Sequence, residues 1–330
     1  KNHRYTPAAG LPEMKEAIVQ KTLQDSGTEV KPNQIIVTNG GKQAVYQAFQ
    51  VIIDDGDEVL VPAPYWTTYP EAIKLAGGKQ VDVFAGADQG YKVTVEQLEA
   101  AYTSKTKALL ICSPSNPTGA VFSKDELAAI GNWVASKENL WVITDEIYQN
   151  LVYEGITAHS ITELVPEIQD RTIMVNGVAK SFAMTGWRLG YALWPDSLVD
   201  MATRLAINCH SCVNAATQFA GIAALEGPQD SVLEMVRAFD ERRGVIVDEL
   251  NSIPGFSCRT PKGAFYAFPN ISGTGQSATE VQNQLLTEAH VATVAGTSFG
   301  HLGEDYVRFS YANSVENIRT ALDRVRNLYS

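Results

Sequence analysis

The chain has 330 residues, of which 45% are hydrophobic and 19% charged, and its formal net charge at pH 7 is -11. This length predicts two domains, and the composition is typical of an ordinary globular protein. The negative charge argues against a surface for nucleic acid or anionic lipid, and no apolar run approaches the roughly 20 residues of a membrane span. Four cysteines are too few for a disulfide framework, which predicts a reducing, cytoplasmic location.

Short apolar runs alternate with helical patterns between residues 34 and 191. Continuous aliphatic and β-branched runs are typical of strands buried on both faces of a mainly parallel sheet. A capping box at Ser123-Lys124-Asp125-Glu126 predicts the start of one intervening helix. The alternation predicts an α/β fold that binds its ligands at the carboxyl ends of the strands. The predicted strands contain residues 35–37, 59–61, 108–111, 141–143 and 173–175.

The pattern changes near residue 230. A long helical stretch covers residues 229–253, with Gly244 as its one weak point. Strand-like residues 264–268, a helical pattern over 278–288, a strand-like run over 307–311 and a helix capped by Ser314 follow. We therefore expect a large domain over residues 1–229 and a smaller α+β domain over residues 230–330.

Residues 179–190 read AKSFAMTGWRLG and place a lysine and an arginine among small and apolar residues. Because burial disfavours an unpaired ammonium, a desolvated Lys180 loses its proton readily and becomes nucleophilic. Arg188 has the planar fork that binds an anionic group of whatever this amine attacks. The segment predicts a Schiff-base site for a phosphorylated aldehyde. A strand-loop-strand with solvated Lys and Arg is the alternative interpretation.

The run from Gly177 through Lys180 to Met184-Thr185-Gly186-Trp187-Arg188 and Gly190 resembles the attachment signature of class I aminotransferases. These are pyridoxal 5'-phosphate enzymes of fold type I. The resemblance implies a large three-layer α/β/α domain with a mainly parallel sheet, and a smaller carboxyl-terminal α+β domain. It also implies that Lys180 binds the cofactor and serves as the catalytic base.

Three further motifs follow predicted strands and match the family's cofactor contacts. In the family, the residue at Asp145 binds the pyridine nitrogen, and those at Tyr148 and Asn116 donate to the cofactor's phenolic oxygen. The turn at Gly40-Gly41, opening a helix, offers backbone N–H groups to the phosphate, which Arg188 completes. Each motif has a plainer interpretation as well: a helix cap at Asp145, a turn at Asn116 and a chain reversal at the glycines.

The resemblance assigns roles to other side chains. Trp66 matches the aromatic residue that stacks on the pyridine ring, and Tyr5 matches a tyrosine that reaches the phosphate of the neighbouring subunit's cofactor. Arg308 matches the arginine that binds the substrate α-carboxylate, whereas its plainer interpretation is an edge-strand charge. Lys42, beside the phosphate turn, matches a lysine that faces the distal carboxylate of the substrate. Many relatives carry Ser at Gly177, so one hydroxyl contact to phosphate is missing here.

The resemblance implies ping-pong transamination between an amino acid and a 2-oxo acid in a homodimer with shared active sites. It also implies several dozen residues ahead of Tyr5 that close over the site. Aspartate with 2-oxoglutarate is the first expectation, because Gly-Gly-Lys-Gln and Met-Thr-Gly-Trp-Arg are typical of one bacterial aspartate aminotransferase subgroup. Aromatic amino acids or prephenate, and C–S lyase chemistry on the same fold, are the alternatives.

Two other classes are less favoured by the sequence. A cofactor-sensing transcription regulator reuses this fold behind a basic helix-turn-helix domain, and a nicotinamide dehydrogenase needs a Gly-x-Gly-x-x-Gly after a strand. Neither pattern occurs in the sequence. We also expect no metal site. Cys209-His210-Ser211-Cys212 has CxxC spacing but no second ligand pair, and small buried side chains on a helix are the favoured interpretation.

Overall fold

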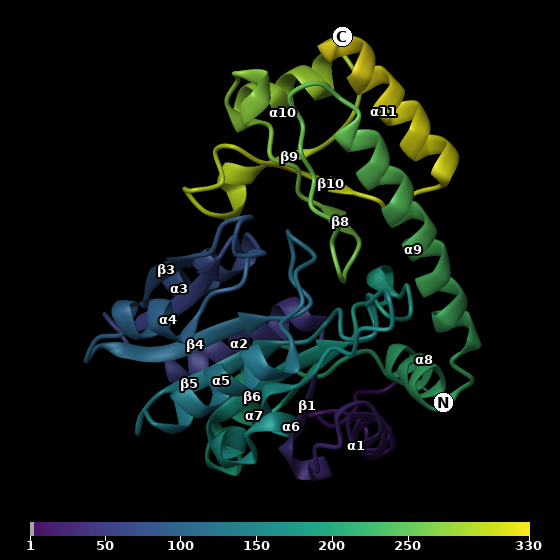
Figure 1. Ribbon diagram of the computed structural model, residues 1–330. Helices are drawn as coiled ribbons and strands as arrows, with labels where there is room; N and C mark the ends of the chain where they lie inside the picture. Colours follow the sequence, from purple (N-terminus) through teal and green to yellow (C-terminus); the bar gives the residue numbers. More distant parts are fainter. Residues whose placement is uncertain (1–2) are drawn as a thin grey trace.

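A computed structural model describes residues 3–330 and contains a large and a small β-sheet (Figure 1). The large sheet has seven strands, in the spatial order β1 (Ile35–Thr38), β7 (Gly190–Leu193), β6 (Thr172–Gly177), β5 (Trp141–Asp145), β4 (Thr106–Cys112), β2 (Glu58–Ala63) and β3 (Lys79–Phe84). The small sheet has the order β8 (Tyr266–Ala267), β10 (Val307–Ser310) and β9 (Val294–Ala295).

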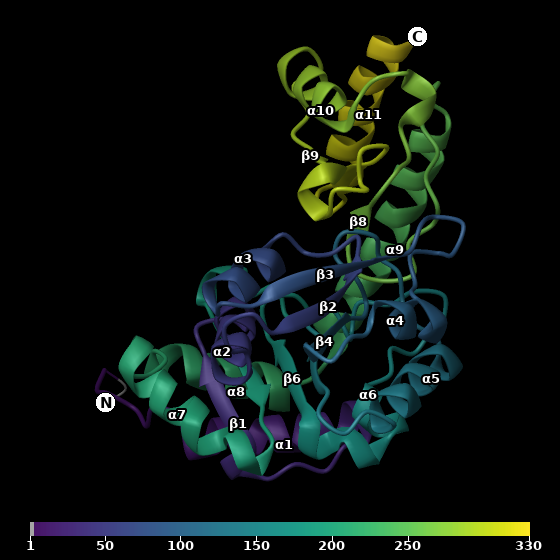
Figure 2. The same ribbon diagram turned by 90° about the vertical axis from the view of Figure 1, so that its left-hand side faces the viewer.

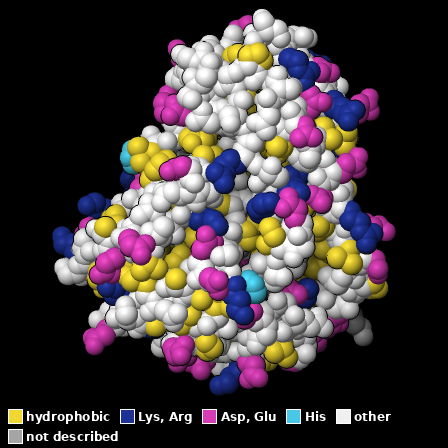
Figure 3. All heavy atoms as spheres, viewed as in Figure 1, with side chains coloured by type: hydrophobic (Ala, Val, Ile, Leu, Met, Phe, Trp, Pro, Cys, Tyr) yellow, Lys and Arg dark blue, Asp and Glu magenta, His cyan; other side chains and the backbone are white. Residues whose placement is uncertain are grey.

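Helices surround both sheets. They are α1 (Pro12–Ser26), α2 (Gly41–Ile52), α3 (Thr68–Leu75), α4 (Val95–Ala101), α5 (Lys124–Ala135), α6 (Ile161–Leu164), α7 (Asp196–His210), α8 (Ala215–Glu226), α9 (Asp230–Asn251), α10 (Ala278–Thr287) and α11 (Val315–Tyr329). Among the described residues, no helix is both long enough and apolar enough to span a bilayer. On the face shown in Figure 3, positive and negative side chains are interspersed.

Side chains alternate between the two faces of the large sheet. Helices pack on both faces, so the sheet is the middle of three layers. On one face, Ile36 and Ile143 pack in a core with residues of α2, α3 and α7. On the other, Val142 and Leu109 pack with α4, α5 and α6, whereas Ile35 and Met174 pack with α1 and α8. Both faces of these strands are therefore buried, which explains their continuous apolar sequences.

One strand of the large sheet runs against the others. The β2–β3, β2–β4, β4–β5 and β5–β6 pairs are parallel, whereas β7 is antiparallel to both β6 and β1. It follows that β1 runs parallel to β6. The carboxyl ends of the parallel strands and the amino end of β7 therefore share one edge, where a doubly wound sheet binds its ligands.

Glycines allow close backbone approach at this edge. Gly190 pairs with Gly177, and a Cβ atom on Gly177 would lie 2.8 Å from the Gly190 Cα. A Cβ on Gly190 would lie 2.5 Å from the carbonyl carbon of Gly40 and closer still to the Gly41 nitrogen. The absence of a side chain at Gly177 thus permits the close approach of β6 and β7.

The small sheet lies beyond the large one and is reached along α9 (Figures 1 and 2). Its core consists of apolar side chains of α9, α10, α11 and the strands, and it includes Tyr148 and Leu151 from the loop after β5. The loop before β8 also contacts the large part of the molecule, because Gly263 donates its N–H to the Gly119 carbonyl at 2.9 Å. The two sheets are thus held together through buried contacts.

The structure confirms the predicted α/β fold with its mainly parallel sheet and its smaller α+β region. The Ser123 capping box opens α5 as predicted, since the Ser123 side chain accepts from the Glu126 N–H. Strand β8 is shorter than the predicted run over 264–268, because Ala264 has a φ of +57° that breaks the extended backbone. The interpretation of Cys209 and Cys212 as small buried side chains on a helix holds only in part: Cys209 lies on α7 but is exposed, and Cys212 lies beyond the end of α7 at His210 and is half-buried.

The close approach at Gly190 predicts the effect of adding one methyl group. Gly190→Ala should lower the free energy of unfolding by about 1–3 kcal/mol, because the clashing atoms belong to backbone that has no room to move. Gly244→Ala is the matched control: nothing lies within 4 Å of its added Cβ, and Ala should stabilise helix α9 by about 0.5–1 kcal/mol. Urea unfolding of both variants measures this difference, and equal stability of Gly190→Ala and the parent would contradict it.

Candidate active site

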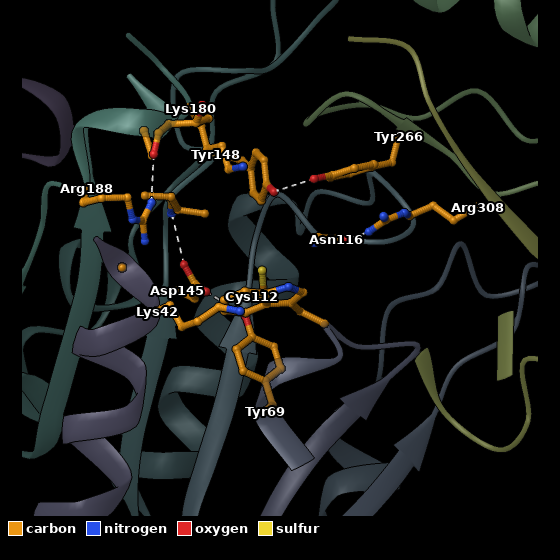
Figure 4. Close-up of a pocket in the computed structure, with 15 residues that line it drawn as sticks. Lys42, Tyr69, Cys112, Asn116, Asp145, Tyr148, Lys180, Arg188, Tyr266 and Arg308 are labelled. Atoms are coloured by element: carbon orange, nitrogen blue, oxygen red, sulfur yellow. Dashed lines mark hydrogen bonds between the residues drawn. The ribbon is translucent and has the colours of Figure 1, made fainter. Parts of the chain in front are cut away.

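A cavity of about 290 Å³ opens at the shared edge of the large sheet, facing the small sheet (Figure 4). Lys180 and Arg188 lie on one side of it, and Asn116 and Arg308 lie on the other. Its lining residues are Gly41, Lys42, Trp66, Tyr69, Cys112, Asn116, Asp145, Ile147, Tyr148, Ala179, Lys180, Thr185, Arg188, Tyr266 and Arg308.

Lys180 follows β6 and extends into this cavity. Its Nζ lies 5.8 Å from the ring centre of Tyr148 and 5.4 Å from that of Phe265. Burial lowers the pKa of Lys180, and the positive charges of Arg188 and Arg308 lower it further, whereas Asp145 raises it. An amine in this environment gives up its proton more easily than a surface lysine does, so it can act as a nucleophile or a base.

Asp145 ends β5 with its carboxylate buried. Its Oδ2 accepts from the Tyr69 hydroxyl at 2.8 Å, and its Oδ1 accepts from the Ile147 N–H at 3.3 Å. The second contact is the turn that the plainer interpretation predicted, and it orients the carboxylate. Burial raises the pKa of Asp145, although the bond from Tyr69 lowers it. A cationic ring nitrogen beside this carboxylate would offset the cost of its burial.

The turn between β1 and α2 forms one corner of the cavity. Gly40 has a φ of +86°, and helix α2 begins at Gly41, so the first N–H groups of the helix are exposed to the cavity. Arg188 lies beside them and donates from Nη2 to the Asn39 carbonyl at 3.3 Å. Its Nη1 donates to the Thr185 carbonyl at 2.9 Å, which orients the guanidinium. A helix amino terminus with an arginine fork is suited to bind phosphate.

Arg308 enters from β10 of the small sheet. Its Nη1 donates to Asn116 Oδ1 at 2.9 Å, and its guanidinium lies 4.5 Å from the ring centre of Tyr266 and 4.8 Å from that of Phe299. Its Nε is buried without a hydrogen-bond partner among the described residues. This arginine is therefore not the solvated edge charge of the plainer interpretation. It has unused donors that suit a planar carboxylate.

Aromatic side chains line the rest of the cavity. The Tyr148 and Tyr266 hydroxyl oxygens are 3.0 Å apart, and burial raises the pKa of both phenols. Trp66 packs edge-on against Tyr69 with ring centres 5.4 Å apart, and the Lys42 Nζ lies 5.2 Å from the Trp66 ring centre. Tyr148 and Tyr266 therefore keep their phenolic protons at neutral pH and can donate hydrogen bonds.

The charges in the cavity are strongly unbalanced. Lys42, Lys180, Arg188 and Arg308 are its cationic lining residues, and Asp145 is its acidic one. The cations lie on three different sides of the acid, in separate positions rather than in one cluster. The arrangement favours a ligand with several separated anionic groups and one cationic nitrogen.

The structure brings together every predicted site residue except Tyr5. Tyr5 is 90% exposed and does not line the cavity of this chain. Sequence reasoning missed Tyr69, Cys112 and Tyr266. Tyr69 lies three residues after Trp66, at the start of α3, and this proximity in the sequence is a signal, whereas Tyr266 reaches the site only through strand pairing that the sequence does not specify.

Known proteins resemble this chain over nearly its whole length. The family described as aminotransferase class I and II matches residues 1–325. An aspartate aminotransferase from Streptomyces avermitilis is 51% identical, covering 100% of this chain and 82% of that protein. The crystal structure of an aspartate aminotransferase from Rhizobium meliloti has a TM-score of 0.95 at 37% identity, covering 99% of this chain and 84% of that one. An aromatic aminotransferase from Pyrococcus horikoshii also has a TM-score of 0.95, at 38% identity, covering 99% of this chain and 87% of that one.

These matches agree with the half-buried lysine, the strand-end carboxylate and the glycine turn found in the cavity. The fold and the sequence signature point to the same group of transferases. The chain belongs to the class I and II aminotransferase family and is an enzyme that transfers amino groups.

Proposed function

We propose that this enzyme binds pyridoxal 5'-phosphate and exchanges the amino group of aspartate or glutamate with a 2-oxo acid. The observation that carries the proposal is the position of Lys180, a half-buried amine with a lowered pKa that shares the cavity with Arg188 and Arg308. The names of the Streptomyces and Rhizobium relatives support aspartate as the amino donor.

The lining residues fit this cofactor. The exposed amino terminus of α2 and Arg188 suit its phosphate, and the crowded Gly40 position supports this fit, because a Cβ there would lie 2.5 Å from Arg188 Nη2. Asp145 suits a protonated ring nitrogen, and Trp66 suits a ring face. When bound, the cofactor supplies an aldehyde that reacts with amines and a ring that withdraws electrons.

Lys180 then has two roles in the proposed mechanism. Its amine would hold the cofactor covalently, and as a free amine it would take the proton from the substrate α-carbon as general base. Asp145 would hold the cofactor's ring nitrogen, and its negative charge would favour the protonated form of that nitrogen. Arg188 and the α2 turn would hold the phosphate.

Asn116 and Tyr148 are the proposed donors to the phenolic oxygen. Arg308 donates to Asn116 Oδ1, so the Asn116 amide presents its NH₂ group elsewhere, where it can donate. Burial keeps Tyr148 protonated, so its hydroxyl can donate as well. Donors at this oxygen adjust the proton affinity of the nitrogen that Lys180 contributes.

Two cations divide the substrate between them in this proposal. Arg308 binds the α-carboxylate through its fork, and Lys42, across the cavity beside Trp66, binds the distal carboxylate. An aromatic substrate is the second candidate, because Trp66 and Tyr69 offer an aromatic wall and the Pyrococcus horikoshii relative is named an aromatic aminotransferase.

We further propose a homodimer with shared active sites and a domain division at residues 229 and 230. Tyr5 is exposed and does not line its own cavity, which supports a contact with the site of a neighbouring subunit. Large apolar side chains are also exposed on α7 (Met201 and Ile207), on α8 (Phe219) and at Trp187. Helix α9, which begins at Asp230 and leads to the small sheet, supports the domain division.

The test of the proposed function is a half-reaction survey. Single amino acids are added to the cofactor-loaded enzyme, and the rates of the absorbance change are ranked. Aspartate and glutamate should react fastest. Lys180→Ala should keep its thermal unfolding midpoint but lose turnover by at least about 10⁴-fold, because both the attachment and the base are gone. Near-normal turnover in this variant, or release of ammonia and pyruvate in place of transamination, would overturn the assignment.

Lys42 should decide between dicarboxylic and aromatic substrates. Lys42→Met keeps the length of the side chain but removes its charge, so the kcat/KM for aspartate should fall about 10- to 100-fold. The kcat/KM for phenylalanine, which lacks a distal carboxylate, is the internal control and should change less than about threefold. Steady-state kinetics with both substrates measure the two kcat/KM values. An equal loss of kcat/KM for both substrates would show that Lys42 does not bind the distal carboxylate.

Asp145→Asn should separate stability from activity. Because burial raises the pKa of Asp145, the folded protein without cofactor holds this proton more tightly than the unfolded chain does. Ionisation therefore costs stability as the pH rises through the folded pKa. Without cofactor, the variant should be more stable than the parent at pH 8, with a smaller difference at pH 5. With cofactor added, the variant should be inactive. Urea unfolding at the two pH values checks this, and a less stable variant at pH 8 would contradict it.

A further inference from the structure

We propose that Tyr266 is a positioning residue that holds two parts of the active site at once, the Tyr148 hydroxyl and the Arg308 guanidinium. This inference rests on the proposed function, which places Tyr148 on the cofactor and Arg308 on the substrate. Tyr266 lines the cavity from β8, and the hydrogen bond to Tyr148 crosses from the small sheet to the loop after β5 (Figure 4).

Strand register places the Tyr266 ring against Arg308. In the antiparallel β8–β10 pair, Tyr266 lies opposite Ser310. Arg308 is two positions away on β10, so its side chain emerges on the same face as that of Ser310 and is a diagonal neighbour of Tyr266. The guanidinium accordingly lies 4.5 Å from the Tyr266 ring centre.

Two rings restrict the guanidinium. Tyr266 contacts it on β8, and Phe299, whose ring centre lies 4.8 Å from it, contacts it from the 3₁₀ turn η5 (Gly296–Phe299). The Phe299 carbonyl in turn accepts the Tyr65 N–H at 2.9 Å, next to Trp66. Aromatic contacts on a cation set the plane of its fork without using its N–H groups, which leaves them for a carboxylate.

The hydroxyl of Tyr266 has a separate task. Each phenol has one O–H to donate, and in the proposed function Tyr148 donates its O–H to the cofactor's phenolic oxygen. The Tyr148 oxygen, 3.0 Å from that of Tyr266, is then an acceptor, and Tyr266 is the donor that faces it. A hydrogen bond from Tyr266 to the Tyr148 oxygen orients the Tyr148 hydroxyl and strengthens the hydrogen bond that Tyr148 donates to the cofactor.

Two variants separate the ring from the hydroxyl. Tyr266→Phe removes only the hydroxyl, and Tyr266→Leu removes both. For each cofactor-loaded variant, one measures the pH midpoint of the cofactor's absorbance change, and the KM and kcat for aspartate. Tyr311→Phe is the matched control, because it deletes another buried hydroxyl of the same region, bonded to the Ala264 carbonyl at 3.2 Å and outside the cavity.

Tyr266→Phe should move the pH midpoint upward by up to about one pH unit, because a weaker Tyr148 donor stabilises the charge on the phenolic oxygen less. Its KM for aspartate should change less than about twofold. Tyr266→Leu should show the same midpoint shift and a KM raised about three- to tenfold, because the ring contact with Arg308 is lost. Tyr311→Phe should move neither quantity, whatever it does to the thermal unfolding midpoint.

A double variant tests whether Tyr266 acts through Tyr148. In a Tyr148→Phe background, adding Tyr266→Phe should leave the pH midpoint where Tyr148→Phe alone puts it. An additional shift there, or no shift from Tyr266→Phe alone while Tyr148→Phe moves the midpoint, would overturn the inference. If Tyr148→Phe itself moves nothing, the role of Tyr148 in the proposed function fails instead, so the two failures are distinguishable.

Discussion

The close backbone contact at Gly190 determines the geometry of the active site. Gly190 begins β7, the strand that runs against its neighbours, and it touches Gly177 on one side and the Gly40-Gly41 turn on the other. This contact brings the start of β7, with Arg188, beside the amino terminus of α2. It also fixes the end of β6, from which the chain proceeds directly to Lys180. A side chain at this point would separate the amine, the arginine and the anion-binding turn.

Burial determines the chemistry of the residues assembled there. Asp145 is buried and Lys180 is half-buried, and in each case burial shifts the pKa in the direction that favours the uncharged form. Both charges are therefore costly in the protein alone, and a ligand with complementary charge relieves the cost. The same principle applies to Arg308, which has a buried Nε without a partner among the described residues.

The sequence predicted what depends on local patterns. Asp145, Asn116 and Lys180 each follow an apolar run, and the carboxyl ends of parallel strands share an edge, so their convergence followed from strand prediction alone. The antiparallel direction of β7 was not predicted, because Gly190 to Leu193 reads like any other buried strand. Tyr266 was missed for a related reason: its proximity to Arg308 depends on the register between β8 and β10, which no local signal encodes. Cys212 was misplaced because the helical pattern of α7 does not show that the helix ends at His210, whereas Cys209 does lie on α7 but is exposed.

The pairing of β8 with β10 has a mechanical consequence. Arg308 and Tyr266 are carried by one two-stranded ladder, so neither can move toward or away from the large sheet without the other. In the proposed function, the side chain that binds the substrate carboxylate and the side chain that orients Tyr148 therefore move as one unit. Binding of a substrate by Arg308 would then also displace the hydrogen-bond donor of Tyr148, which would couple substrate recognition to the proton affinity of the bound cofactor.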